Sequence, residues 1–134
     1  MNESERAAGL AMTPGYEYAR RVGNQLHVAG QVPHDAEGQL VGINDPHAQA
    51  MQCLRNLSTL LAVHGFSIGD VQRLVVYVVG QHEDLARAWN GVTEWFSGQV
   101  PPATLLGVAC LGHKWQLVEV DATVVKSNES ASPR

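Results

Sequence analysis

Apolar and polar residues alternate most regularly near the end of the chain, over residues 115–125, and this alternation predicts a β-strand. One face of the predicted strand is entirely apolar and consists of Val118, Val120, Ala122 and Val124. The other face combines large apolar side chains with carboxylates and consists of Trp115, Leu117, Glu119, Asp121 and Thr123. Such a mixed face is typical of a binding site or a subunit interface. An edge strand with solvated acids is the alternative, and from this segment alone it is the simpler explanation, because acidic residues are mostly exposed.

Further segments have the composition of strands, and they cover residues 16–21, 25–29, 71–79 and 103–109. Gly23-Asn24 predicts a tight hairpin between the first two of these strands. The third is nearly all apolar and rich in valine, which predicts a strand buried on both faces. Residues 34–46 are rich in Asp, Gly, Asn and Pro and predict a loop.

Apolar residues recur at helical spacing in two places. The first helix is predicted over residues 46–64, with Asp45 as N-cap, proline at the first helical position, and Gly65 as the stop. Its apolar face consists of Ala50, Leu54, Leu57 and Leu61. The second helix carries Leu85, Trp89, Val92 and Phe96, and it ends at Gly98.

The predicted order of elements is therefore ββαβαββ, an α+β fold in which two helices cover one face of a single mixed sheet. The other sheet face would be open in a monomer, so a homo-oligomer is expected. We expect a flexible arm over residues 1–13, a single domain over residues 14–126, and a Ser-rich disordered tail over residues 127–134.

Composition narrows the possible functions. The net charge of −4, without a basic stripe, argues against nucleic acid as a partner. No apolar run approaches the ~20 residues of a membrane helix, and the first residues do not resemble a signal peptide, so we expect a cytoplasmic protein. Cys53 and Cys110 lie in apolar segments and are expected to be reduced and buried. Neither CxxC nor HxxxH spacing occurs, so no metal site is expected.

Several short motifs, in this order and spacing, resemble the RidA (YjgF-type) family, which is also named endoribonuclease L-PSP. The motifs are Tyr16, Gly23-Asn24, Gly30-Gln31-Val32-Pro33, Asn90, Pro102-Ala103 and Leu117-Val118-Glu119-Val120-Asp121. The resemblance implies a chorismate-mutase-like fold and homotrimers whose sheets pack into a barrel, with clefts between subunits. It also implies cofactor-independent hydrolysis of small enamines and imines, such as 2-aminoacrylate, to a ketone and ammonia.

The resemblance assigns Glu119 to the handling of water and protons, and it places Tyr16, Gly30 and Asn90 in the cleft. Deaminases of the family carry an arginine directly after the Pro-Ala dipeptide, where its guanidinium binds the substrate carboxylate. This chain has Thr104 at that position. A charge-assisted contact of ~1.5–3 kcal/mol would therefore be absent.

Other residues near the predicted cleft have two interpretations each. Glu119 is either a proton carrier with a raised pKa or half of an ion pair across the subunit interface, and Asp121 is expected to pair with a neighbouring cation. Thr104 contacts a neutral substrate or a water, or it is an ordinary strand residue. Trp115 lines the cleft or anchors the interface.

Cys110 is a nucleophile or an inert buried thiol, and the second is expected, because an active thiol needs a neighbouring base or positive charge. His113 and Lys114 could bind an anion in place of the missing arginine, although a solvated turn is favoured. The remaining histidines are expected to be surface or packing residues, and they are His27, His34, His47, His64 and His82.

The sequence thus predicts a homotrimeric RidA-type hydrolase that acts without a cofactor on an imine or enamine less acidic or bulkier than 2-iminopropionate. A non-catalytic trimer that binds small ligands or acts as a chaperone is the alternative. A ribonuclease is disfavoured by the acidic charge.

Overall fold

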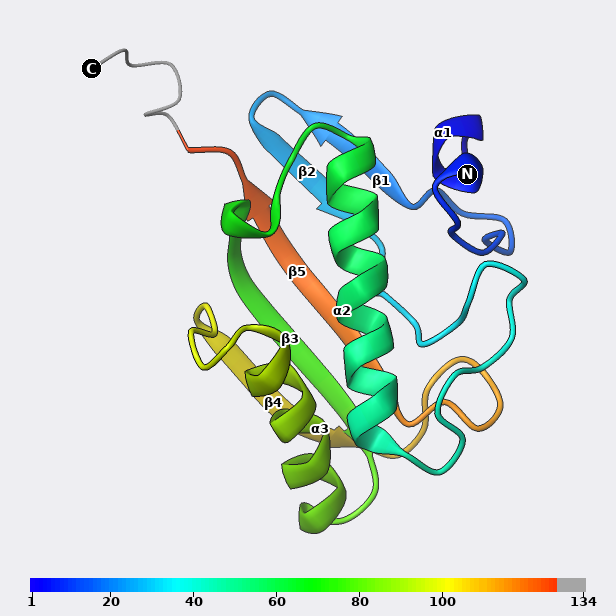
Figure 1. Ribbon diagram of the computed structural model, residues 1–134, viewed down its shortest axis with the longest axis vertical. Coiled ribbons are helices and arrows are strands. Elements are labelled where there is room, and N and C mark those ends of the chain that lie inside the picture. Colours follow the sequence, from blue (N-terminus) through cyan, green and yellow to red (C-terminus); the bar gives the residue numbers. More distant parts are fainter. Residues whose placement is uncertain (128–134) are drawn as a thin grey trace.

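The computed structural model describes residues 1–127, which form one five-stranded sheet with helices packed on it (Figure 1). The strands are β1 (Ala19–Val22), β2 (Gln25–Val28), β3 (Val71–Val79), β4 (Ala103–Val108) and β5 (Val118–Val125). Their order across the sheet is β1-β2-β5-β3-β4. Strands β3 and β4 are parallel and the other neighbours are antiparallel. The predicted mixed sheet and the order ββαβαββ are confirmed.

Both long helices lie on the same face of the sheet, as predicted. They are α2 (Pro46–Val63) and α3 (His82–Trp95), and Figure 1 shows them side by side in front of the strands. Helix α2 begins where expected, because the Asp45 carboxylate accepts a hydrogen bond from the Ala48 amide at 3.1 Å. A helix this apolar on one face is held chiefly by burial. Its fully buried residues include Ala50, Cys53, Leu54, Leu57, Leu60 and Leu61.

The two faces of the sheet differ in burial. Val118, Val120 and Val124 of β5 are buried beneath the helices, which confirms the predicted apolar face. On β3, Leu74, Val76 and Val78 are buried, whereas Val75, Tyr77 and Val79 are only half-buried. The prediction that this strand is buried on both faces is therefore wrong for the single chain. The strand is apolar throughout because its second face, which we call the open face, also carries apolar residues.

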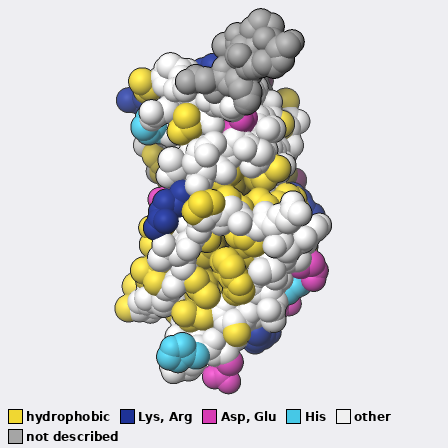
Figure 2. All heavy atoms as spheres, turned by 90° about the vertical axis from the view of Figure 1, so that its left-hand side faces the viewer, with side chains coloured by type: hydrophobic (Ala, Val, Ile, Leu, Met, Phe, Trp, Pro, Cys, Tyr) yellow, Lys and Arg dark blue, Asp and Glu magenta, His cyan; other side chains and the backbone are white. Residues whose placement is uncertain are grey.

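The open face carries the side chains that alternate with the core residues of β3, β4 and β5. In the register of the sheet Tyr77 lies opposite both Leu106 and Glu119, and Val75 lies opposite both Thr104 and Asp121. Paired residues point to the same side of a sheet, so these six residues share the open face. Figure 2, which looks at the left-hand side of Figure 1, shows hydrophobic side chains gathered in the middle of the molecule.

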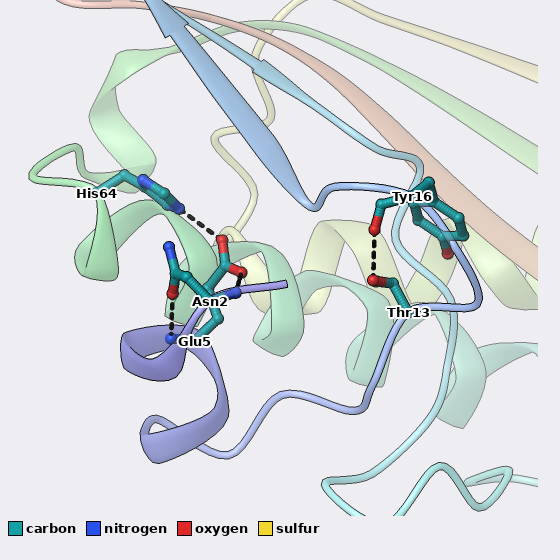
Figure 3. A network of polar contacts seen from close by, with 5 residues as sticks. All are labelled: Asn2, Glu5, Thr13, Tyr16 and His64. Atoms are coloured by element: carbon teal, nitrogen blue, oxygen red, sulfur yellow. Dashed lines mark hydrogen bonds and ion pairs between the residues drawn. The ribbon is translucent and has the colours of Figure 1, made fainter.

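The N-terminal segment differs from the expected flexible arm. Residues Glu3–Ala7 form a short helix, α1, that begins with a capping box between Asn2 and Glu5. Glu5 is 2% exposed, and its Oε2 lies 2.7 Å from Nε2 of His64 at the end of α2 (Figure 3). Leu10 and Ala11 are buried as well. The arm is held to the domain because it contributes both a buried carboxylate in contact with His64 and buried apolar residues.

The end of the chain differs in two details. Strand β5 begins at Val118, and Trp115 has a positive φ of 68°, so this tryptophan belongs to the turn before the strand. The tail predicted over residues 127–134 lies outside the described residues, apart from Ser127. Within residues 1–127, the helices are too short or too polar to cross a bilayer.

Candidate functional site

Glu119 lies on the open face of β5, directly against the backbone of Gly30. A Cβ atom at position 30 would lie 2.1 Å from Oε2 of Glu119. The carboxylate therefore occupies the space that any other side chain at position 30 would fill. Gly30 belongs to the segment after β2, and the bridge between Gln31 and Val120 fixes that segment beside β5.

Gln116 holds the other carboxylate oxygen of Glu119. The Gln116 side chain is buried, and its Nε2 donates to Glu119 Oε1 at 3.2 Å and to the Val118 carbonyl at 3.0 Å. Its Oε1 accepts from the His113 amide at 3.2 Å. A buried amide with all of these partners fixes the orientation of the carboxylate. Sequence reasoning missed Gln116, because the left-handed turn at Trp115 that brings it inside is not encoded by a glycine.

Tyr16 is the third member of this cluster. Partial burial, and then the nearby charge of Glu119, raise the pKa of its phenol. The Thr13 hydroxyl donates to the Tyr16 carbonyl and holds the loop around it (Figure 3). The structure thus brings together Glu119, Gly30 and Tyr16, three of the residues that the sequence proposed.

A small pocket opens between the N-terminal arm and the segment after β2. Its volume is about 20 Å³, which is room for a group the size of a water molecule. Residues 11–14 of the arm form one wall, and Gly30 lies in the lining. The polar side chains of the lining are Thr13, Tyr16, Tyr18, Gln31, His34, Asn56 and His113. Neither a lysine nor an arginine contributes to this lining.

His34 and His113 meet in this pocket, although no sequence pattern pairs them. Their ring centroids lie 4.6 Å apart with an edge-to-face angle of 70°. Burial, and then the neighbouring His113, lower the pKa of His34, while Asp35 acts in the opposite direction. The expectation that His34 and the other unassigned histidines only pack or face solvent is therefore incomplete for His34. His64 and His47 instead contact Glu5 and Glu94.

Thr104 lies on the open face but away from this cluster. It is two strands across and two residues along from Glu119, so the two Cα atoms are separated by about 12 Å. The Thr104 hydroxyl lies 2.5 Å from Nη2 of Arg73 on β3, which donates to it. Asn90 lies on α3, in the helical layer that covers the opposite face. One chain therefore does not bring Thr104 or Asn90 to Glu119.

Cys110 and Trp115 lie together in a second, wider hollow, which also includes His113 and Lys114. Cys110 is exposed, so the prediction that it is buried is wrong, while Cys53 is buried as expected. Cys110 comes after the end of β4, beyond the segment that the helices cover. Trp115 is 59% exposed, and the Lys114 ammonium lies 5.6 Å from its ring. His113 lines both hollows.

The arrangement around Glu119 suits proton transfer to or from a small ligand. Tyr16 and two histidines line a space that accommodates one small polar group, and the fixed carboxylate packs against Gly30, which lines the same space. Within residues 1–127, no three His, Cys, Asp or Glu side chains are grouped closely enough to hold a metal ion.

Comparison with known proteins agrees with the resemblance drawn from the motifs. Residues 7–126 match the family described as endoribonuclease L-PSP. A RutC family protein of Pyrococcus horikoshii is 31% identical over 111 residues, which cover 83% of this chain and 86% of that protein.

Solved structures share the fold. The structure of Escherichia coli TdcF with bound serine is 25% identical and superposes with a TM-score of 0.77 over 91% of this chain and 95% of the other. RidA from an Antarctic Psychrobacter is 27% identical, with a TM-score of 0.75 over 87% of this chain and 92% of the other.

Proposed function

Because the chain belongs to the RidA/YjgF-type endoribonuclease L-PSP family, we propose that it is a small-molecule hydrolase of the enamine and imine deaminase type. The observation that carries the proposal is the position of the Glu119 carboxylate. Gln116 orients it, and the absence of a side chain at Gly30 leaves room for it. The proposed enzyme needs no cofactor and acts in the cytoplasm.

The reaction that fits this site is the addition of water to a C=N bond. Glu119 takes a proton from water as the water oxygen bonds to the imine carbon. The proton then passes to the nitrogen and gives a carbinolamine. Glu119 next takes the proton of the new hydroxyl group and passes it to the nitrogen as the C–N bond breaks, so ammonia leaves and a ketone remains. Water and imine are consumed in equal amounts and the carboxylate is regenerated. The fixed position of Glu119 would contribute because no reorganisation is needed when the proton moves.

We propose that a second copy of the chain completes the site. The separation of about 12 Å between Thr104 and Glu119 is too large for both to contact one small substrate within a single chain. The open face carries the apolar side chains of Val75, Tyr77 and Leu106 beside its polar residues, and such apolar side chains favour burial against another subunit. A homotrimer with substrate clefts between subunits would place Thr104 and Asn90 of one copy near Glu119 of the next.

The specificity of the proposed enzyme follows from Thr104. A threonine does not replace the bidentate contact of an arginine with a carboxylate, so simple amino-acid imines are expected to be poor substrates. A less acidic or bulkier imine is favoured, and exposed Trp115 offers a surface on which a flat substrate could stack.

Deamination of 2-iminopropionate (iminopyruvate), generated in situ, tests both statements. We expect the wild-type protein to be slow and Thr104→Arg to be faster, because the new guanidinium supplies the carboxylate contact. In the Arg variant, Glu119→Gln should abolish the gain, whereas Asp121→Asn, which removes the next acid on the same face, should keep it. Rapid turnover by the wild type would disprove the altered specificity. If neither the wild type nor any variant hydrolyses 2-iminopropionate, and none of them hydrolyses other imines such as aromatic ones, the proposed hydrolase activity is disproved.

A non-catalytic ligand-binding trimer is the second candidate, because the lining of the pocket beside Glu119 lacks a cationic anchor for an acidic substrate. Glu119→Ala separates the two functions. An enzyme would lose turnover while it stays folded, whereas a binding protein with mainly apolar contacts would keep most of its affinity.

A further inference from the structure

The imidazole pair of His34 and His113 is the feature of the pocket that the proposed reaction leaves unused. Both side chains are half-buried, and both line the same small pocket as Tyr16 and Gly30. The ring centroids are 4.6 Å apart. Both residues therefore line a space that borders the glycine against which Glu119 packs.

Both histidines are held in place by the surrounding structure. The His34 carbonyl accepts from Asn56 Nδ2 at 2.9 Å and from Gln52 Nε2 at 3.3 Å, and both donors belong to α2. The His113 amide donates to Gln116, the same residue that orients Glu119. The backbone of both histidines is thus fixed, and His113 shares its partner Gln116 with the Glu119 carboxylate, as a preorganised subsite requires.

The surroundings of the pair favour a neutral ring at His34. Burial and the second ring lower the pKa of His34, so near neutral pH its ring is uncharged and offers a lone pair. The titratable and charged groups around the pair are Tyr16 and Tyr18 in the same pocket, Glu119 against Gly30, Asp35 next to His34, and Lys114 next to His113. Lys114 lies over the Trp115 ring in the second hollow and does not line the pocket itself.

We propose that His34 and His113 form a subsite that binds the nitrogen-bearing end of the ligand. The imidazole nitrogens, together with the Glu119 carboxylate that packs against Gly30, accept hydrogen bonds from an ammonium, amino or iminium group. The pocket volume of about 20 Å³ admits a small group such as NH₂ or NH₃⁺, and its lining contains neither a lysine nor an arginine that would attract a carboxylate instead. The assignment of this nitrogen to an imine substrate rests on the proposed function, whereas the subsite itself does not require turnover.

The test compares L-alanine with L-lactate, which differ only in an ammonium group against a hydroxyl. The ring resonances of His34 and His113 are followed by NMR in the full-length protein as each compound is added near pH 7. We expect alanine to shift both sets of ring resonances and to bind at least several-fold more tightly than lactate. Equal binding of the two compounds, or no response of the rings to alanine, would overturn the subsite.

Variants separate this role from a structural one. His34→Phe removes the acceptor and should abolish the preference for alanine, whereas His34→Gln keeps an acceptor and should retain part of it. His82→Phe, at an exposed position at the start of α3, is the matched control and should behave like the wild type. Loss of the preference in His34→Gln to the same extent as in His34→Phe would contradict hydrogen bonding by the imidazole.

The failures of the two proposals look different. Selective binding of alanine without any imine hydrolysis would support the subsite and contradict the proposed hydrolase activity. Imine hydrolysis without a preference for alanine would support the hydrolase activity and contradict the subsite.

Discussion

Gly30 is the residue on which the geometry of the proposed site depends most directly. The terminal oxygen of Glu119, rather than backbone, occupies the space beside it, and a glutamate side chain can move. A Gly30→Ala protein should therefore fold, with the carboxylate displaced from its position beside Tyr16. We expect a loss of at least tenfold in imine hydrolysis or ligand affinity, with little change in the free energy of unfolding.

Gly107→Ala is the matched control for this substitution. A Cβ at Gly107 would meet its nearest atom at 3.7 Å, which is ordinary contact, so activity and stability should both be retained. If Gly30→Ala keeps full activity, the position of the Glu119 carboxylate is not important for function. If Gly30→Ala unfolds the protein, the Glu119 side chain does not move aside for the new methyl group, and the argument is wrong.

The residues of the site differ in how far the sequence could reveal them. Glu119 follows from alternation and from the resemblance, because a strand fixes the face of every residue in it. Gln116, His34 and His113 could not be found this way. They meet only because two loops, one after β2 and one before β5, pack against each other, and no local periodicity records that contact.

At the scale of the elements, helix α1 shows how a short segment is fixed by a few polar contacts. Glu5 is buried, accepts from the Asn2 amide at 2.8 Å and contacts His64 at 2.7 Å. Glu5→Ala should lower the free energy of unfolding by about 2 kcal/mol, because it leaves buried groups without their charged partner. Glu3→Ala, on the exposed side of the same helix, should change it by less than ~0.5 kcal/mol. Urea denaturation at pH 7 measures the free energy of unfolding of both variants. Equal losses in Glu5→Ala and Glu3→Ala would show that the contacts of Glu5 do not stabilise the protein.

Tyr18 connects the arm to β1 and predicts a pH dependence. Its hydroxyl donates to the Ala11 carbonyl at 2.7 Å, and burial, then the nearby Tyr16 and Glu5, raise its pKa to about 12. The folded state thus favours the neutral phenol, so its contribution is fully present below pH 10 and is lost as the pH rises from 10 to 12. Tyr18→Phe should cost about 1 kcal/mol at pH 7, and this difference from wild type should shrink above pH 10. Thermal unfolding across this range checks it, with Tyr77→Phe as control; a constant difference would contradict the argument.

The elements were predictable to the extent that their signals are local. Asp45, the proline after it and Gly65 bound α2 as predicted, because caps and stops act through neighbouring backbone groups. Helix α1 was missed although Asn2 and Glu5 form its capping box, because five residues are too few to show an apolar period. Trp115 was placed on the strand because alternation in the sequence continues past the point where the backbone turns.

At the scale of the whole molecule, the second face of β3 carries apolar side chains that the single chain does not bury. The sequence predicted burial on both faces, and the chain alone buries only one of them. The contradiction disappears if a second copy covers the open face. The wrong prediction for the monomer is thus an argument for the proposed trimer, in which single domains over residues 14–126 would pack sheet to sheet.

Leu106 is the position at which the proposed trimer is best tested. It lies on the open face opposite Tyr77, on the edge strand β4, and it does not belong to the core beneath the helices. Leu106→Glu should leave the domain folded but place a charge where the subunits meet, so the protein should sediment as the 14.5 kDa chain instead of a trimer. Ile43→Glu adds the same charge at a loop residue that is 62% exposed, and it should leave the assembly intact. Because the proposed clefts need two chains, Leu106→Glu should also lose activity. A wild-type protein that sediments as a monomer would contradict both the trimer and the shared site.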